Sequence, residues 1–450
     1  MKGYIAAAAL AAMPVALNAQ TQLGNPPPRY AVKDLGTLGG TTSVAGGINK
    51  RGWVVGNATL SGDAAANAFL QHHGVMNTLG TLGGVNSNAA GLAERGQAVG
   101  FAESSIPDPM GENFCFFGTV ATCLPFLWQD GAMTALPVLG GTNGAALGIN
   151  NEGQIGGVAE TSTLDSTCPS PEFQSEPVLW VKGAIRPLPT FPGDPDGFVN
   201  SINDKGQAVG ASGSCWSIFP ANAIHALLWQ NGKATNLGTL GGTLFSEAFA
   251  INERGQVVGA SDVSGDTSLY APFGNPYIHP FSWQNGVMKD LGVLPGDTAS
   301  FALSLNNEGE AVGLGSRAII WRDGVAIDIN SLVPGPPFSP LYLLYASAIN
   351  DHGEVVGQGL TSNGELHAFL AVPCDEEHLD ATPCNDDEIG AEVVAAATLD
   401  GTVNASAPRK SVAMLAGRFG GKSGLAQIPQ ISGRRVPAFG DRARKSDAQH

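Results

Sequence analysis

The chain has 450 residues, of which 61 are glycine, 14% are charged and 43% are hydrophobic. This apolar content argues against an intrinsically disordered chain, and this much glycine argues against a mainly helical one. The formal net charge of −16 disfavours nucleic acid as a partner, because phosphate binding needs a basic surface.

The N-terminus has the pattern of a secretory signal peptide over residues 1–19. Lys2 supplies a positive charge, residues 4–17 are apolar, and Ala19 is a small residue before the expected cleavage site. The stretch is shorter than the ~20 residues of a membrane-spanning helix, and Pro14 interrupts it. We therefore expect an exported protein, secreted, periplasmic or at the cell surface, without a transmembrane segment.

Six cysteines in an exported protein predict disulfide bonds. Proximity along the chain favours one pairing among the 15 that six cysteines allow. The predicted pairs are Cys115–Cys123, Cys168–Cys215 and Cys374–Cys384. No C-x-x-C pair is present, so the cysteines do not indicate a metal site.

A short unit with the pattern G-x-x-x-G recurs seven times, at spacings of 44 to 57 residues. An Asn-x-x-Gly tetrapeptide precedes it in every copy but the second, which has Ala93, and this tetrapeptide is typical of a type I turn. The unit is therefore expected to be a β-hairpin. Its copies are Gly52–Gly56, Gly96–Gly100, Gly153–Gly157, Gly206–Gly210, Gly255–Gly259, Gly309–Gly313 and Gly353–Gly357.

A second hairpin follows each unit. Its turn is often Asn-Gly or Asp-Gly, the sequence that a type I′ turn requires, and its returning strand leads into L-G-x-L. Its first strand ends in tryptophan in five copies, and Gln71 and Ala371 take that position in the other two. The tryptophans are Trp128, Trp180, Trp229, Trp283 and Trp321.

Four antiparallel strands per period of about 49 residues predict an all-β fold, a seven-bladed β-propeller over residues 29–372. A β-helix is the alternative, but its coils are much shorter. We expect the S-x-A-x-x-I-N strand to be innermost. The first repeat and the last each lack one strand, which predicts that Tyr30–Gly36 pairs antiparallel with Leu366–Val372 and closes the ring.

The repeat consensus resembles the HAF repeat family of bacterial extracellular proteins. His367-Ala368-Phe369 matches the family motif literally, and the LGTLGG, S-x-A-x-x-I-N and G-Q-V-V-G segments complete it. The resemblance implies export and a bacterial source, and it supplies no catalytic residues. His225 and His279 occupy the same repeat position as His367, so we expect all three to be structural residues on different blades.

Few residues stand out as candidate site residues. Asp194, Asp196 and Asp297 replace the usual LGG-T turn, and Trp216 lies in a long insertion. We expect no cofactor. Ca²⁺ bound by the three acids is the alternative, since this ion prefers several oxygen ligands.

Two segments follow the predicted propeller, an acidic one with two cysteines over residues 373–392 and a basic tail over 393–450 that we expect to be disordered. The main functional prediction is a monomeric, non-catalytic scaffold that binds an extracellular protein or a glycan. Two alternatives remain open, a secreted polysaccharide-acting hydrolase or lyase and a surface adhesion protein. Catalysis would need an acid and a base at one pocket.

Overall fold

The structure is a computed structural model that describes residues 28–168, 171–215, 225–265, 277–333 and 339–374. The predicted signal peptide and basic tail lie outside these residues, as does the acidic segment beyond Cys374. Within the described ranges, no helix has the length and apolar character needed to cross a membrane.

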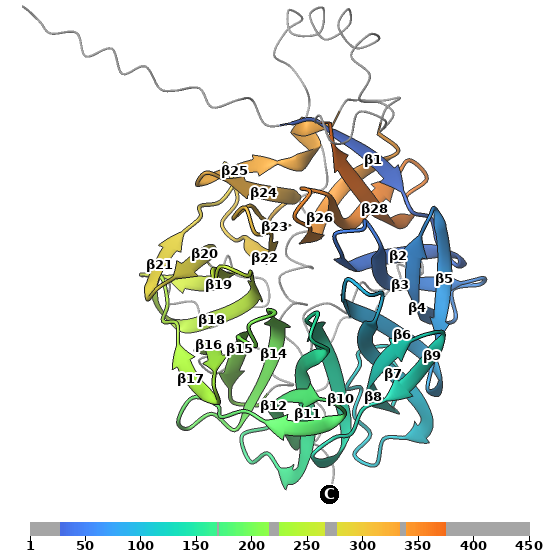
Figure 1. The fold of residues 1–450 in the computed structure, drawn as a ribbon, viewed down its shortest axis with the longest axis vertical. Coiled ribbons are helices and arrows are strands. Elements are labelled where there is room, and N and C mark those ends of the chain that lie inside the picture. The colour runs from blue at the N-terminus through green and yellow to red at the C-terminus, as the bar shows by residue number, and fades with distance from the viewer. Residues whose placement is uncertain (1–27, 169–170, 216–224, 266–276, 334–338, 375–450) are drawn as a thin grey trace, which may run out of the picture.

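The described chain folds into antiparallel sheets of four strands, arranged side by side around a central axis in a propeller-like fold (Figure 1). A short 3₁₀ helix, η1 (Ile329–Leu332), interrupts this pattern. The strands, sheet by sheet, are β2–β5 (Gly39–Ile48, Val54–Leu60, Ala66–His72, Val75–Gly80), β6–β9 (Gly83–Leu92, Ala98–Pro107, Ala121–Gln129, Ala132–Ala135), β10–β13 (Gly140–Ile149, Gln154–Leu164, Phe173–Val181, Ala184–Pro187), β14–β17 (Asp196–Ile202, Ala208–Gly213, His225–Gln230, Lys233–Asn236), β18–β21 (Gly241–Ile251, Val257–Val263, Ile278–Gln284, Val287–Asp290), β22–β25 (Phe301–Leu305, Ala311–Leu314, Ala318–Arg322, Val325–Asp328), and β26–β28 (Leu341–Ile349, Val355–Thr361, Leu366–Pro373) with β1 (Tyr30–Asp34).

The first strand of each set lies nearest the axis (Figure 1). The two terminal strands pair as the sequence predicts. β1 runs antiparallel to β28, from Tyr30 opposite Pro373 to Asp34 opposite Phe369, and it forms the outer edge of its sheet. A single parallel bridge, Thr42 to Leu366, joins this sheet to β2–β5, so that the two together count as one eight-stranded sheet.

The predicted turns have the backbone conformations that their residues favour. In the turn before β15, Asn203 Oδ1 accepts hydrogen bonds from the backbone N–H groups of Lys205 and Gln207, and Gly206 has a φ of +72°. In the outer hairpin of β24 and β25, Asp323 and Gly324 have φ values of +49° and +77°. Both central residues of a type I′ turn have such positive φ values.

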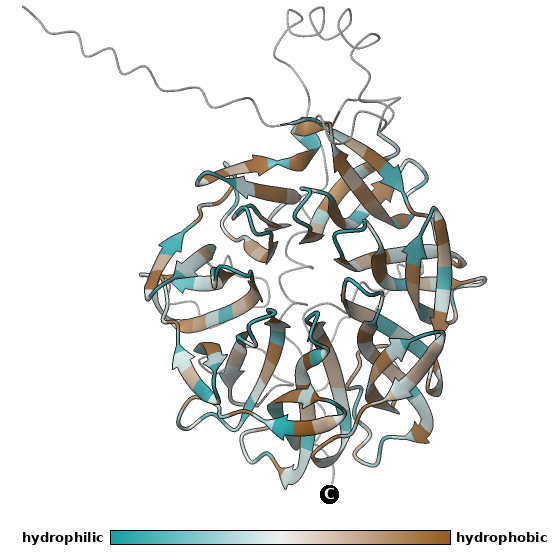
Figure 2. Cartoon of the chain, in the orientation of Figure 1, coloured by the Kyte–Doolittle hydropathy of each residue, from teal (hydrophilic) through white to brown (hydrophobic). Residues whose placement is uncertain are grey.

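The second glycine of G-x-x-x-G lies where the second strand of a sheet passes the first. A Cβ atom at Gly56 would stand 1.9 Å from the carbonyl oxygen of Val44, and the same clash would occur at Gly100 against Asn88. A side chain is therefore sterically excluded, which explains why the glycine recurs. Hydrophobic residues concentrate in the strands and hydrophilic ones in the turns near the axis (Figure 2).

Candidate functional site

A pocket of about 290 Å³ lies beside β12, where the loop between β13 and β14 crosses it. Gln174 and Glu176 alternate along β12, so their side chains lie on the same face of the strand. The loop of residues 188–195 supplies the other walls. The lining residues are Gln174, Glu176, Leu188, Pro189, Thr190, Asp194 and Pro195.

Hydrogen bonds from the neighbouring strands fix this loop. The backbone N–H of Leu188 donates to the Pro177 carbonyl at 2.8 Å. The indole N–H of Trp229, a buried residue of β16, donates to the Pro189 carbonyl at 2.7 Å. Within the loop, Thr190 Oγ1 donates to the Asp194 carbonyl at 2.7 Å. The pocket walls are therefore held by the sheet and do not depend on a ligand.

Asp194 is the best-anchored carboxylate of the pocket. Its Oδ2 atom accepts hydrogen bonds from Ser212 Oγ at 2.6 Å and from His225 Nδ1 at 2.8 Å. The His225 ring stacks on Phe191, with 3.9 Å between the ring centroids. The side chain of Asp194 is only 11% exposed. Because both donors bind Oδ2, they fix the orientation of the carboxylate, and Oδ1 takes no part in these two bonds.

The pairing of His225 departs from the repeat. At the equivalent position, Arg317 forms an ion pair, and His279 and His367 form hydrogen bonds, with the acid that ends the outer strand of the same sheet. In the β14–β17 sheet that acid is replaced by Asn236, whose Oδ1 accepts from the Gly238 N–H. His225 instead contacts Asp194 of the incoming loop.

Glu176 occupies the same repeat position in the preceding sheet. It faces Ala159 of β11 across the strand pair and points to the pocket. Burial of the carboxyl raises the pKa of Glu176 above its ordinary value. Because desolvation disfavours the charged form, this carboxyl keeps its proton to higher pH than an exposed glutamate. The pocket therefore combines a carboxyl suited to donate a proton with an oriented carboxylate.

The predicted site acids do not converge. Asp196 is buried and its Oδ1 accepts from the Ser175 N–H at 2.7 Å, whereas Asp297 belongs to another sheet and accepts from the Ser316 N–H at 2.9 Å. A three-acid Ca²⁺ site is therefore not formed. Trp216 lies outside the described residues. Sequence reasoning singled out Asp194 but missed Glu176 and His225 as members of its site.

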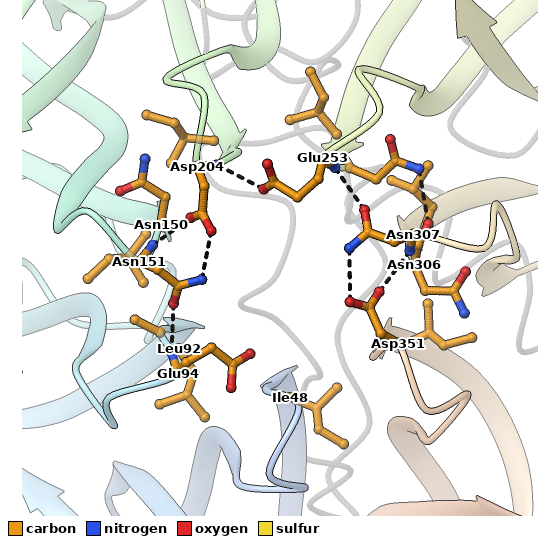
Figure 3. A pocket seen from close by; sticks show the side chains of 17 residues that line it. Ile48, Leu92, Glu94, Asn150, Asn151, Asp204, Glu253, Asn306, Asn307 and Asp351 are labelled. Atoms are coloured by element: carbon orange, nitrogen blue, oxygen red, sulfur yellow. Dashed lines mark hydrogen bonds between the residues drawn. The ribbon is translucent and has the colours of Figure 1, made fainter.

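A second pocket, of about 220 Å³, lies on the central axis (Figure 3). Its polar rim consists of one residue from each Asn-x-x-Gly turn or its equivalent. From the first of these residues to the sixth, the backbone N–H donates to the side chain of the next at 2.8 to 3.0 Å. Lys50 Nζ forms an ion pair with Asp351 at 2.9 Å, which connects the last rim residue to the first. These rim residues are Lys50, Glu94, Asn151, Asp204, Glu253, Asn307 and Asp351.

Electrostatics at the rim also favours a structural role. The hydrogen bond to Asp351 raises the pKa of Lys50. Burial alone would raise the pKa of Asp351, but hydrogen bonds from Lys50 and Asn307 lower it overall. The rim carboxylates are occupied by bonds between neighbouring sheets, so we assign the rim to stability and the pocket beside β12 to function.

Two of the predicted disulfides are present, Cys115–Cys123 and Cys168–Cys215. The second joins Cys168, in the connection between β11 and β12 that leads to Gln174, to Cys215, in the chain that follows β15 and Ser212. It therefore ties together the two segments next to the pocket. Cys384 lies outside the described residues, so the third pair stays a prediction.

No protein-family model matches the chain, and no curated protein sequence matches it. The solved structures that are similar to it include the following two. One is described as a new family of polysaccharide lyase, PL25 ulvan lyase, with 10% identity, a TM-score of 0.36 and coverage of 76% of this chain and 94% of that chain. The other is the ulvan lyase bound to -[GlcA(1-4)Rha3S]-, with 9% identity, a TM-score of 0.37 and the same coverage.

The similar structures are described as polysaccharide lyases, which is not the non-catalytic scaffold that the sequence analysis predicts first. Their descriptions correspond to the alternative prediction, a polysaccharide-acting enzyme.

Proposed function

We propose that this protein is an exported enzyme that cleaves glycosidic bonds in a polysaccharide at the pocket beside β12. The observation that carries the proposal is the presence in one pocket of two carboxyl groups in different environments. Burial raises the pKa of Glu176, and Asp194 is held by two hydrogen-bond donors. Breaking a glycosidic bond requires one carboxyl group that holds a proton and acts as the acid, and a second that is ionised and acts as the base.

In this proposal Glu176 is the general acid and protonates the oxygen of the leaving sugar. Asp194 is the general base, and its Oδ1 faces the reacting group while Oδ2 is held by Ser212 and His225. His225 is a positioning residue, since it acts through Asp194. Trp229 fixes the wall at Pro189 and is a positioning residue as well.

Export of the protein forms part of the proposal. Two disulfides among the described residues support it, because structural disulfides persist in oxidising compartments. The predicted signal peptide over residues 1–19 and the resemblance to the HAF repeat family are consistent with it.

We further infer that the sheets form a closed seven-bladed propeller. Supporting this, buried asparagines of the Asn-x-x-Gly turns donate to the backbone carbonyl of the corresponding turn in the next sheet, for example from Asn203 to Asn252 at 3.0 Å. The same bond from Asn350 to Asn49, at 3.0 Å, connects the last turn to the first. Together with the β1–β28 pairing, it leaves no free sheet edge between the ends of the array.

Substitution of the two carboxyl residues tests the function. Glu176→Gln and Asp194→Asn should each lower the rate of release of new sugar ends from polysaccharide by a factor of about 10² to 10⁴. Asp297→Asn is the matched control, because Asp297 is also a loop acid that accepts a hydrogen bond from the end of a second strand, Ser316, but belongs to another sheet. It should retain activity.

The pH profile supplies an independent readout. Because catalysis needs protonated Glu176, kcat/KM should fall on the alkaline side with an apparent pKa above that of an ordinary glutamate. Glu176→Gln should abolish this limb. If Asp194→Asn and Asp297→Asn reduced activity equally, the loss would reflect loop stability and the assignment of Asp194 would be wrong.

A further inference from the structure

We propose that the polysaccharide cleaved at this pocket is uncharged, so that the reaction is a hydrolysis. The inference rests on the proposed function of Glu176 and Asp194 and adds the substrate class. It is carried by the charge and polarity of the groups that surround the pocket.

Among the residues that the structure describes at this pocket, none of the lining side chains is a cationic partner for an anionic sugar. Its ionisable lining residues are Glu176 and Asp194, and none of the seven lining residues is lysine or arginine. Of the other titratable groups at this edge, His225 is already bonded to Asp194 through Nδ1, and Asp196 is a further buried acid. A uronate or sulfate here would face a carboxylate without compensation, which is unfavourable in a partly desolvated site.

The basic residue of this sheet that is nearest the pocket along the strands lies on the other face of the sheet. Arg186 of β13 lies opposite Leu179 of β12, three residues from Glu176. Because side chains alternate between the two faces along a strand and directly paired residues share a face, Arg186 and Glu176 lie on opposite faces. A carboxylate bound between Glu176 and Asp194 would therefore be separated from this arginine by the sheet.

The remaining walls match the surface of a neutral sugar. Leu188, Pro189 and Pro195 present apolar surface suited to the C–H face of a sugar ring. Gln174 supplies an amide donor and acceptor, and the Thr190 hydroxyl can accept a hydrogen bond while it donates to Asp194. These groups bind hydroxyls and need no charge on the ligand.

An uncharged substrate determines the reaction type. Elimination requires a proton acidified by a neighbouring carboxylate, which a neutral sugar lacks. In the hydrolysis, Asp194 takes a proton from water, the water oxygen bonds to the anomeric carbon, and the bond from that carbon to the leaving oxygen breaks. Glu176 gives its proton to the leaving oxygen, so one water is consumed per bond cleaved.

Binding and cleavage are measured separately to test this. The Glu176→Gln variant is titrated calorimetrically with neutral oligosaccharides (β-glucan, mannan and galactan fragments) and with oligouronates and sulfated oligosaccharides of equal length. At least one neutral ligand should bind tenfold or more tightly than every anionic one. In wild-type digests, the products should carry new reducing ends and no unsaturated uronate.

Gln174→Lys provides a gain-of-function arm. The substitution places a cation beside Glu176, so the ratio of the affinity for neutral oligosaccharides to the affinity for anionic ones should fall at least threefold. Tighter binding of oligouronates by the Glu176→Gln variant, or binding of no neutral oligosaccharide, would overturn the inference. Cleavage of uronate polymers that depends on Glu176 and Asp194 would overturn it while upholding the proposed function. Neutral binding without any cleavage would contradict the proposed function and the hydrolysis, and would uphold only the preference of the pocket for uncharged sugars.

Discussion

Nη2 of Arg322 donates a hydrogen bond to the Oη of Tyr30 at 2.6 Å, although 292 residues separate the two along the chain. The guanidinium lies 5.7 Å from the centroid of the Tyr30 ring and forms an ion pair with Glu310 at 2.5 Å. The Tyr30 hydroxyl in turn donates to the carbonyl of Gly353. This set of contacts attaches the first strand to two sheets at once.

Removal of this link should weaken the attachment of β1. Arg322→Met leaves Tyr30 and Glu310 without their shared partner, and should lower the free energy of unfolding by about 2 kcal/mol. Tyr30→Phe should cost about 1 kcal/mol. Thermal denaturation measures both. Arg254→Met is the control, since Arg254 pairs with Glu308 at an exposed site and its loss should change little. Equal effects of the two arginine changes would contradict the prediction.

The second repeat offers a stabilising substitution. Ala93 stands where the other copies have asparagine, and the Asn150 carbonyl therefore lacks the donor that Asn252 receives from Asn203. Ala93→Asn should supply that donor and accept from the turn N–H groups, raising stability by about 1 kcal/mol. Asn203→Ala should do the opposite, by about 2 kcal/mol. A lower melting temperature for Ala93→Asn would show that the turn cannot accept the side chain.

Glu247 should make stability depend on pH. It is buried on β18, which raises its pKa to about 8, while Asn200 Nδ2 donates to it at 3.1 Å. The folded protein keeps this proton up to about pH 8, whereas the unfolded chain releases it near pH 4.5. Stability should therefore be greatest below about pH 4.5, fall as the pH rises to about 8, and level off above, by at most roughly 5 kcal/mol.

Urea denaturation across this range measures the Glu247 effect. Glu247→Gln keeps the shape and the acceptor oxygen but cannot ionise, so the slope between about pH 4.5 and 8 should flatten. Glu308→Gln, which removes an exposed carboxyl, should leave the slope unchanged. An unchanged slope in Glu247→Gln would assign the pH dependence to other groups.

Much of the fold is readable from local patterns, because the same steric demand recurs in each repeat. The tryptophan position illustrates this. Trp229 lies opposite Ala208, the first residue of β15, and Gln71 and Ala371 lie opposite the first residues of β3 and β27 in the same way. Periodicity therefore located strand pairing even where the side chain differs.

The site is less readable, because it depends on how one repeat departs from the others. His225 looks the same in sequence as His279 and His367, yet its partner is a loop acid 31 residues earlier. The available signal was Asn236, which stands where Asp290 ends the equivalent strand. Glu176 carried a signal too, as the acid in a position otherwise held by histidine, arginine, asparagine or leucine.

The two disulfides should contribute differently to stability and to activity. Cys168–Cys215 closes a loop of 47 residues and Cys115–Cys123 one of 8, so chain entropy predicts losses of about 4 and about 2.5 kcal/mol on removal. Only the former joins segments beside the pocket. Cys168→Ser with Cys215→Ser should therefore also lower kcat/KM, whereas Cys115→Ser with Cys123→Ser should lower the melting temperature alone. Both pairs are assayed well below their melting points. A matching loss of kcat/KM in the Cys115 and Cys123 variant would show that activity follows global stability and not the tether at the pocket.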